Sequence, residues 1–280
     1  MHVLASEFHD LIVVLAADNV AALTNDSLCH VDIVADMVVQ LCGRLVVRSG
    51  GADLAGQLPG AQGRIAFAWL VYNRHRVAAR EELATAIWGE ERPAASAQAV
   101  RALLSKLRAV IGRDSLPADG PLHLTLDDGA NIDVEVAART IHDAESGIVR
   151  KEWERAWIAS QIAMNVTRRS FLAGHEGAWI DERRGEFGAI YTRALATLAA
   201  AALQLAETEL LTAERAAREL VAAEPLSEGA TGLLMRALDA LGERPAALVV
   251  YDEFRVRLRE ALGVAPGPRL LALHSEIVMR

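Results

Sequence analysis

The most regular pattern of apolar positions in the chain lies between Ser96 and Ile111. Apolar residues recur there at i, i+3, i+4, i+7 and i+11, and they are Val100, Leu103, Leu104, Leu107 and Ile111. This spacing places them on one face of a helix. Ser96 is a favourable N-cap residue, and Gly112 is a typical helix stop. The pattern predicts a helix that buries its leucines and exposes the opposite face.

The exposed face of this helix carries small residues between cations. A rotation of about 100° per residue places Gln98, Ala102, Ser105 and Ala109 at its centre. Arg101 and Arg108 flank this centre on one side, and Lys106 flanks it on the other. Small side chains let a helix approach the floor of a DNA groove, and cations reach phosphates or a guanine edge. On periodicity alone, an ordinary solvated surface helix is the commoner explanation.

The neighbouring segments strengthen the interpretation as a DNA-binding helix. Two short strands pivot at Gly43, and a buried helix over residues 64–73 follows them. A short helix from Arg80 to Trp88 carries its acidic residues in the first turn. After the cationic helix, the alternations over Leu122–Leu126 and Ile132–Val136 predict a strand, a turn and a second strand. Three helices followed by such a hairpin form a winged helix.

The rest of the chain is patterned as helices almost throughout. We expect helices over 134–148, 151–166, 176–207, 211–223, 227–241, 244–262 and 268–279. Short helix pairs that end at Pro or Gly suggest a tetratricopeptide-like array, although the internal repeat is weak. The predicted fold is therefore mainly α, with a winged helix and small sheets over 37–133 and an all-helical repeat domain over 134–280.

Composition adds a charge pattern that agrees with this division. The net charge is −8, but residues 1–36 hold six acidic residues and no Lys or Arg. Residues 37–133 hold eleven basic and ten acidic residues, so the acidity lies outside the predicted DNA-binding segment. We interpret residues 1–36 as a poorly ordered or mis-annotated extension, with the functional protein starting near Met37. The two cysteines, Cys29 and Cys42, are expected to be reduced.

The sequence offers no recognisable catalytic or metal-binding constellation. His175 and Glu176 begin like a zinc-protease helix, but position 179 is Trp instead of the second His that zinc needs. The glycines at 50, 51 and 56 are not followed by the Gly-Lys-Ser/Thr of a phosphate-binding loop. We therefore predict a protein that is not an enzyme, with no cofactor and no metal.

Several segments distributed over residues 37–280 match the pattern of one known family. They are Leu58-Pro59-Gly60-x-Gln62-Gly63-Arg64, Arg80-Glu81-Glu82-Leu83, Ile87-Trp88, Leu103-Leu104-Ser105-Lys106-Leu107-Arg108, Pro225-Leu226-Ser227-Glu228, Leu234-Met235-Arg236-Ala237-Leu238 and Leu262-Gly263-Val264-Ala265-Pro266. In these segments the chain resembles the SARP group, the antibiotic regulatory proteins of actinobacteria. Such proteins pair an OmpR-type winged helix, which has an N-terminal sheet, with a bacterial transcriptional activator domain.

The resemblance implies a role for individual residues. The residues that it places on the DNA face are Arg80, Gln98, Arg101, Ser105, Lys106 and Arg108. It also implies that the loop Gly89–Pro93, with Glu90 and Glu91, faces RNA polymerase. The expected partners are double-stranded DNA, RNA polymerase and a second copy of the chain. The expected location is the cytoplasm, without membrane contact.

One departure from the family pattern leaves a second hypothesis open. Family wings usually carry basic residues, whereas this segment offers His123 and the acidic pair Asp127-Asp128. Carboxylates beside phosphates are unfavourable. The alternative is therefore a protein-interaction scaffold whose winged helix no longer binds DNA.

Overall fold

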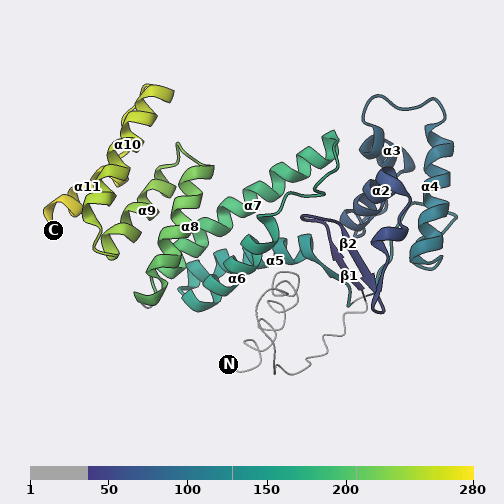
Figure 1. Ribbon diagram of the computed structural model, residues 1–280, viewed down its shortest axis with the longest axis horizontal. Helices are drawn as coiled ribbons and strands as arrows, with labels where there is room; N and C mark the ends of the chain where they lie inside the picture. The colour runs from purple at the N-terminus through teal and green to yellow at the C-terminus, as the bar shows by residue number, and fades with distance from the viewer. Residues whose placement is uncertain (1–36, 128, 206) are drawn as a thin grey trace. The chain divides into compact units, whose positions relative to one another are not determined.

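The computed structural model describes residues 37–127, 129–205 and 207–280 (Figure 1). The hypothesis about residues 1–36 concerns residues outside this range. By their contacts, the described residues form two compact units. The first unit comprises residues up to Val136 together with Asn165–Gly188, and the second comprises Ala137–Met164 and Ala189–Arg280. The mainly helical fold with a small N-terminal sheet is confirmed.

The first unit contains a small sheet in the order β3-β2-β1-β4. Its strands are β1 (Met37–Gln40), β2 (Val46–Ser49), β3 (Ala52–Asp53) and β4 (Asn131–Ile132). The hairpin of β1 and β2 pairs Met37 with Ser49, so the predicted strand pair is confirmed. Gly43 makes the connection with a φ of 89°, a conformation that favours glycine.

Three helices follow the hairpin and pack on one another, namely α2 (Gly60–Tyr72), α3 (Arg80–Trp88) and α4 (Ser96–Ile111) (Figure 1). The α2 helix begins four residues earlier than its apolar block, and it buries Phe67 and Trp69. The bounds of α3 agree with the prediction. Ser96 is the first helical residue of α4, whereas Ala95 occupies the N-cap, so the expected cap at Ser96 is wrong.

The predicted strand–turn–strand of the wing is wrong within the described residues. Leu122 forms only an isolated bridge with Ala78. Leu122, Leu124 and Leu126 are all buried while Thr125 is exposed, so the alternation does report one buried face. The second predicted strand ends at Ile132, because Asp133 begins α5 (Asp133–Arg150). β4 instead pairs in parallel with β1.

Asp133 ties the start of α5 to the end of the β1 strand. Its carboxylate accepts hydrogen bonds from the backbone N–H groups of Leu41, at 2.8 Å, and Cys42, at 2.9 Å. Complete burial raises the pKa of Asp133 to about 6, although these hydrogen bonds and the charge of Arg169 act in the opposite direction. Cys42 is a free, buried thiol, and burial raises its pKa.

The segment 165–188 packs against the sheet and α2 although it is remote from them in sequence. The backbones of Phe171 and Cys42 form an isolated antiparallel β-bridge. Arg169 donates a hydrogen bond to the side-chain oxygen of Gln40 at 3.0 Å. Phe171 also contacts Phe187, with tilted rings whose centroids lie 5.3 Å apart, and the guanidinium carbon of Arg183 lies 4.9 Å from the Tyr72 ring centroid. These contacts explain why the segment belongs to the first unit.

The second unit consists of helices. They are the main part of α5, α6 (Trp153–Thr167) up to Met164, α7 (Ala178–Ala202) from Ala189 onward, α8 (Leu210–Ala223), α9 (Glu228–Ala240), α10 (Arg244–Leu262) and α11 (Pro268–Met279). The helices α8, α9 and α10 lie side by side (Figure 1). Their shared core includes Leu220, Met235 and Phe254. Among the described residues, no helix is both long and apolar enough to cross a membrane.

Candidate nucleic-acid interface

The α4 helix is anchored by the leucines that the periodicity singled out. Val100 and Leu104 are each 1% exposed and Leu107 is 0% exposed, whereas Leu103 and Ile111 are half-buried. The helix packs on α2 and α3. This packing fixes which side of α4 faces solvent, so the predicted orientation of the helix is confirmed.

The opposite side of α4 forms an exposed ridge of Gln98, Arg101, Ser105 and Lys106. Within the described part of the chain, neither Arg101 nor Lys106 has an ion-pair partner. Ala102 and Ala109 are exposed between these residues. The ridge thus combines small residues, polar groups and two unpaired cations.

Arg108 and Arg80 lie elsewhere and contact a loop. Arg108 is half-buried, and it donates from Nε to the carbonyl of Leu116 at 2.8 Å and from Nη2 to that of Pro117 at 3.0 Å. Arg80 donates to the carbonyls of Gly120, at 3.1 Å, and Ala118, at 3.4 Å. Both guanidinium groups therefore hold the loop over residues 116–120. A DNA contact by either remains a prediction.

A further exposed cation, Arg113, lies just after α4, and it is not among the residues predicted to contact DNA. It lies beyond the helix stop at Gly112, so a search restricted to helical periodicity excludes it. Asp114 and Asp119 are also exposed in this loop. They lower the positive charge near the C-terminal end of α4.

The loop between α3 and α4 carries Glu90 and Glu91, and both are exposed. The preceding helix is well fixed, because the carboxylate of Glu82 accepts from the Ala79 N–H at 2.9 Å and from Arg76 at 2.7 Å. The hydrogen bond from Arg76, followed by that from Ala79, lowers the pKa of Glu82. The structure thus presents the two loop glutamates to solvent.

The segment expected to form the wing contributes little positive charge. Asp127 is exposed and Asp128 lies outside the described residues. His123 is half-buried, and its Nδ1 atom is shielded with no hydrogen-bond partner in the described structure. An anionic partner at this face would therefore meet the cations of α4 and of the loop that follows it, and few from the expected wing.

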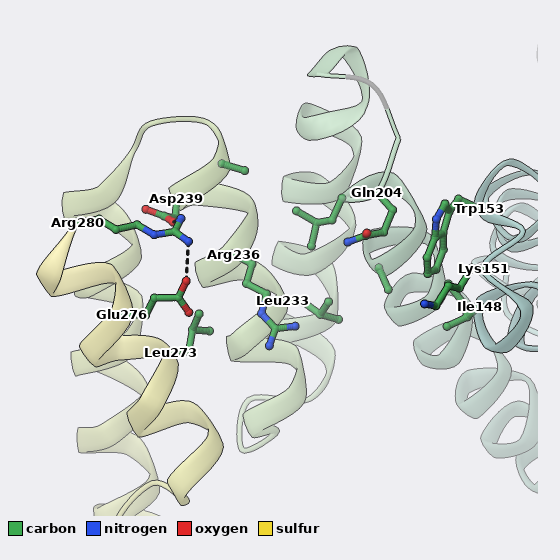
Figure 2. Close-up of a pocket in the computed structure, with 13 residues that line it drawn as sticks. Ile148, Lys151, Trp153, Gln204, Leu233, Arg236, Asp239, Leu273, Glu276 and Arg280 are labelled. Carbon is green, nitrogen blue, oxygen red and sulfur yellow. Dashed lines mark hydrogen bonds and ion pairs between the residues drawn. The ribbon is translucent and has the colours of Figure 1, made fainter.

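The second unit contains a separate groove of about 980 Å³. Figure 2 shows its lining, which includes Trp153, Gln204 and Arg236. Arg280 forms ion pairs with Asp239 at 3.1 Å and Glu276 at 2.5 Å. The lining thus mixes both signs of charge with apolar surface. Across the residues described, His, Cys, Asp and Glu nowhere form a group of three that could hold a metal ion.

Residues 132–278 match the family model described as bacterial transcriptional activator domain. The chain belongs to this family. The SARP-type identification made from the sequence is thereby confirmed at the level of the family.

Two curated relatives named regulatory protein AfsR are similar to the chain. The protein from Streptomyces griseus is 29% identical over 75% of this chain. That from Streptomyces coelicolor is 31% identical over 81% of this chain. The chain spans only 21% and 23% of their respective lengths.

A solved structure, Mycobacterium tuberculosis EmbR in complex with a low-affinity phosphopeptide, has a similar fold. The TM-score is 0.72 at 22% sequence identity, over 87% of this chain and 65% of that one. This likeness supports the arrangement of a winged helix followed by helical repeats in a member of the activator-domain family.

Proposed function

We propose that this protein is a sequence-specific DNA-binding transcription regulator, and that α4 enters the major groove. The observation that carries the proposal is the exposed ridge of Gln98, Arg101, Ser105 and Lys106 on a helix whose other face is buried. Arg and Lys read the guanine edge, and Gln reads the adenine edge. Membership of the activator-domain family supports a regulatory role.

Recruitment of RNA polymerase is the second part of the proposal. Glu90 and Glu91 are exposed in the loop after α3. Their two negative charges would complement a partner surface that carries positive charge. The double variant Glu90→Ala/Glu91→Ala should bind promoter DNA like the wild type but lose transcription activation in vitro. Unchanged activation would exclude this loop as the polymerase contact.

A gel-shift experiment tests DNA binding itself. The full chain is titrated against a duplex from upstream of its own gene at low salt, with a scrambled duplex of equal length as control. We expect binding of the promoter duplex at protein concentrations that leave the scrambled one free. Absence of a shift with folded protein would contradict the proposal.

The alternative of a protein-interaction scaffold is supported by a different observation. Asp127 lies in the segment where a basic wing would contact DNA, and the groove of the second unit is large enough for a partner segment. A scaffold would bind neither duplex at any salt concentration.

Formation of a homodimer, which a palindromic operator would require, is tested by analytical ultracentrifugation of the full chain.

A further inference from the structure

A second pocket lies in the first unit, where three segments remote in sequence meet. Its volume is about 270 Å³. Arg44 and Leu45 follow β1, Asp53 and Ala55 lie around the end of β3, and Ala173 and His175 come from the segment before α7. Arg64 of α2 also lines the pocket.

Two guanidinium groups line this pocket without a carboxylate partner. Arg44 is exposed and Arg64 is half-buried, and within the described residues neither takes part in an ion pair. Other arginines of the same unit are paired, since Arg74 contacts Glu135 at 2.6 Å and Arg184 contacts Asp181 at 2.9 Å. Two cations lining one small pocket repel each other unless an anion lies between them.

The carboxylate in the pocket lining is engaged by the backbone. Oδ1 of Asp53 accepts the N–H of Ala55 at 2.9 Å, which closes a local turn. One carboxylate cannot balance two guanidinium groups. The pocket therefore keeps a net positive charge.

His175 adds a polar atom that lacks a partner. Its Nδ1 atom is shielded from solvent, and the described structure offers it no hydrogen bond. The backbone of His175 is held in place, because its N–H donates to Leu172 at 3.1 Å and its carbonyl accepts from Arg184 at 2.7 Å. A buried polar atom without a partner is costly, and a ligand that contacted this atom would remove the cost.

Backbone hydrogen bonds hold two walls of the pocket together. The N–H of Gly43 donates to Ser170 at 2.8 Å, and the N–H of Ala173 donates to Gly43 at 3.0 Å. The carbonyl of Arg44 accepts from the Gln40 side chain at 2.9 Å. These bonds fix the arginine-bearing turn against the histidine-bearing segment, so little ordering would accompany ligand binding.

We propose that this pocket binds an oxyanion of the phosphate type, held by Arg44 and Arg64 with His175 as an additional hydrogen-bonding group. The planar fork of donors on each guanidinium group matches the oxygens of a phosphate. The volume accommodates a phosphate group or a small phosphorylated molecule. The phosphate comes either from such a molecule in solution or from the backbone of bound DNA.

The test is a titration of the full chain with inorganic phosphate by isothermal calorimetry, without DNA and at constant ionic strength. We expect saturable binding that Arg44→Gln and Arg64→Gln each weaken by about tenfold or more. His175→Phe should weaken binding by a smaller factor. The matched control is Arg168→Gln, which alters an exposed arginine of the same unit that does not line the pocket.

Three measurements test the phosphate site and identify the source of its anion. Failure of the folded wild type to bind phosphate, or equal binding by the pocket variants and Arg168→Gln, would overturn the proposal. Because the titration contains no DNA, the ridge variant Arg101→Ala should bind phosphate normally, so the site is tested independently of DNA recognition. Competition between phosphate and promoter duplex would identify the DNA backbone as the source of the anion, and independent binding would identify a small molecule.

Discussion

At the scale of single residues, Arg101 has the simplest expected role. It is exposed on α4 without an ion-pair partner among the described residues, so its removal should leave the fold intact. We expect Arg101→Ala to weaken promoter binding by about 1–3 kcal/mol, as loss of a base contact does. Fluorescence anisotropy measures this change, with Arg139→Ala, an exposed position on α5, as control. Wild-type affinity in Arg101→Ala would show that another face binds DNA.

Arg108 should behave differently because it holds the loop over residues 116–120. The Arg108→Ala variant deprives the carbonyls of Leu116 and Pro117 of their donor. We expect the free energy of unfolding to fall by about 1 kcal/mol, since the site is only half-buried. Urea denaturation measures this loss, and Lys106→Ala should show none. Equal stability of the two variants would exclude the structural role of Arg108.

Asp133 should make stability depend on pH. Its pKa is about 6 in the folded protein against 3.8 as the ordinary value, so the folded state binds the proton more tightly. The stability that this proton contributes is complete below about pH 4 and is lost as the pH rises through 6. The difference corresponds to about 3 kcal/mol. Urea denaturation of wild type and Asp133→Asn across this range should show the wild type losing stability relative to the variant, and a flat difference would contradict this.

At the scale of elements, local signals predicted the helices better than the strands. The bounds of Arg80–Trp88 and Arg244–Leu262 agree with the prediction, because capping residues and glycines are local. The alternation over Leu122–Leu126 correctly predicted alternate burial, but burial does not reveal whether a partner strand is present. The parallel pairing of β4 with β1 depends on residues about 90 positions apart, which no local pattern reports.

The candidate site was predictable in part for the same reason. The periodicity correctly predicted which face of α4 is buried and that Gln98, Arg101 and Lys106 are exposed. It could not predict that Arg80 and Arg108 hydrogen-bond to a loop, because that loop has no periodicity of its own. The pocket of Arg44 and Arg64 requires the segment around His175, which is more than a hundred residues away.

The buried side of α4 can be tested as an element. Leu107 is fully buried, so Leu107→Ala should lower the free energy of unfolding by about 2–5 kcal/mol through lost burial and a cavity. Ala102→Ser, on the exposed side, should change it by less than about 0.5 kcal/mol. Thermal denaturation compares the two. Similar effects in both variants would mean that α4 is not oriented as described.

At the scale of the whole molecule, charge decides how DNA binding must depend on salt. The net charge is −8, so the field of the whole chain does not favour DNA, and attraction must come from local cations such as Arg101, Lys106 and Arg113. About three or four phosphate contacts would give a slope of about −2.7 to −3.6 in a plot of log affinity against log salt. Raising the salt from about 50 to 200 mM should then weaken binding by about forty- to a hundred-and-fiftyfold.

The same titration separates phosphate contacts from base contacts on α4. If Lys106 contacts a phosphate, Lys106→Ala should reduce the steepness of the salt slope by about one unit, because one counterion fewer is released. Gln98→Ala carries no change of charge, so it should lower affinity and leave the slope unchanged. A slope near zero in the wild type would mean that binding does not proceed through phosphate contacts. Such a slope would contradict the proposed role of α4, since recognition of a duplex by this ridge requires its cations to displace counterions.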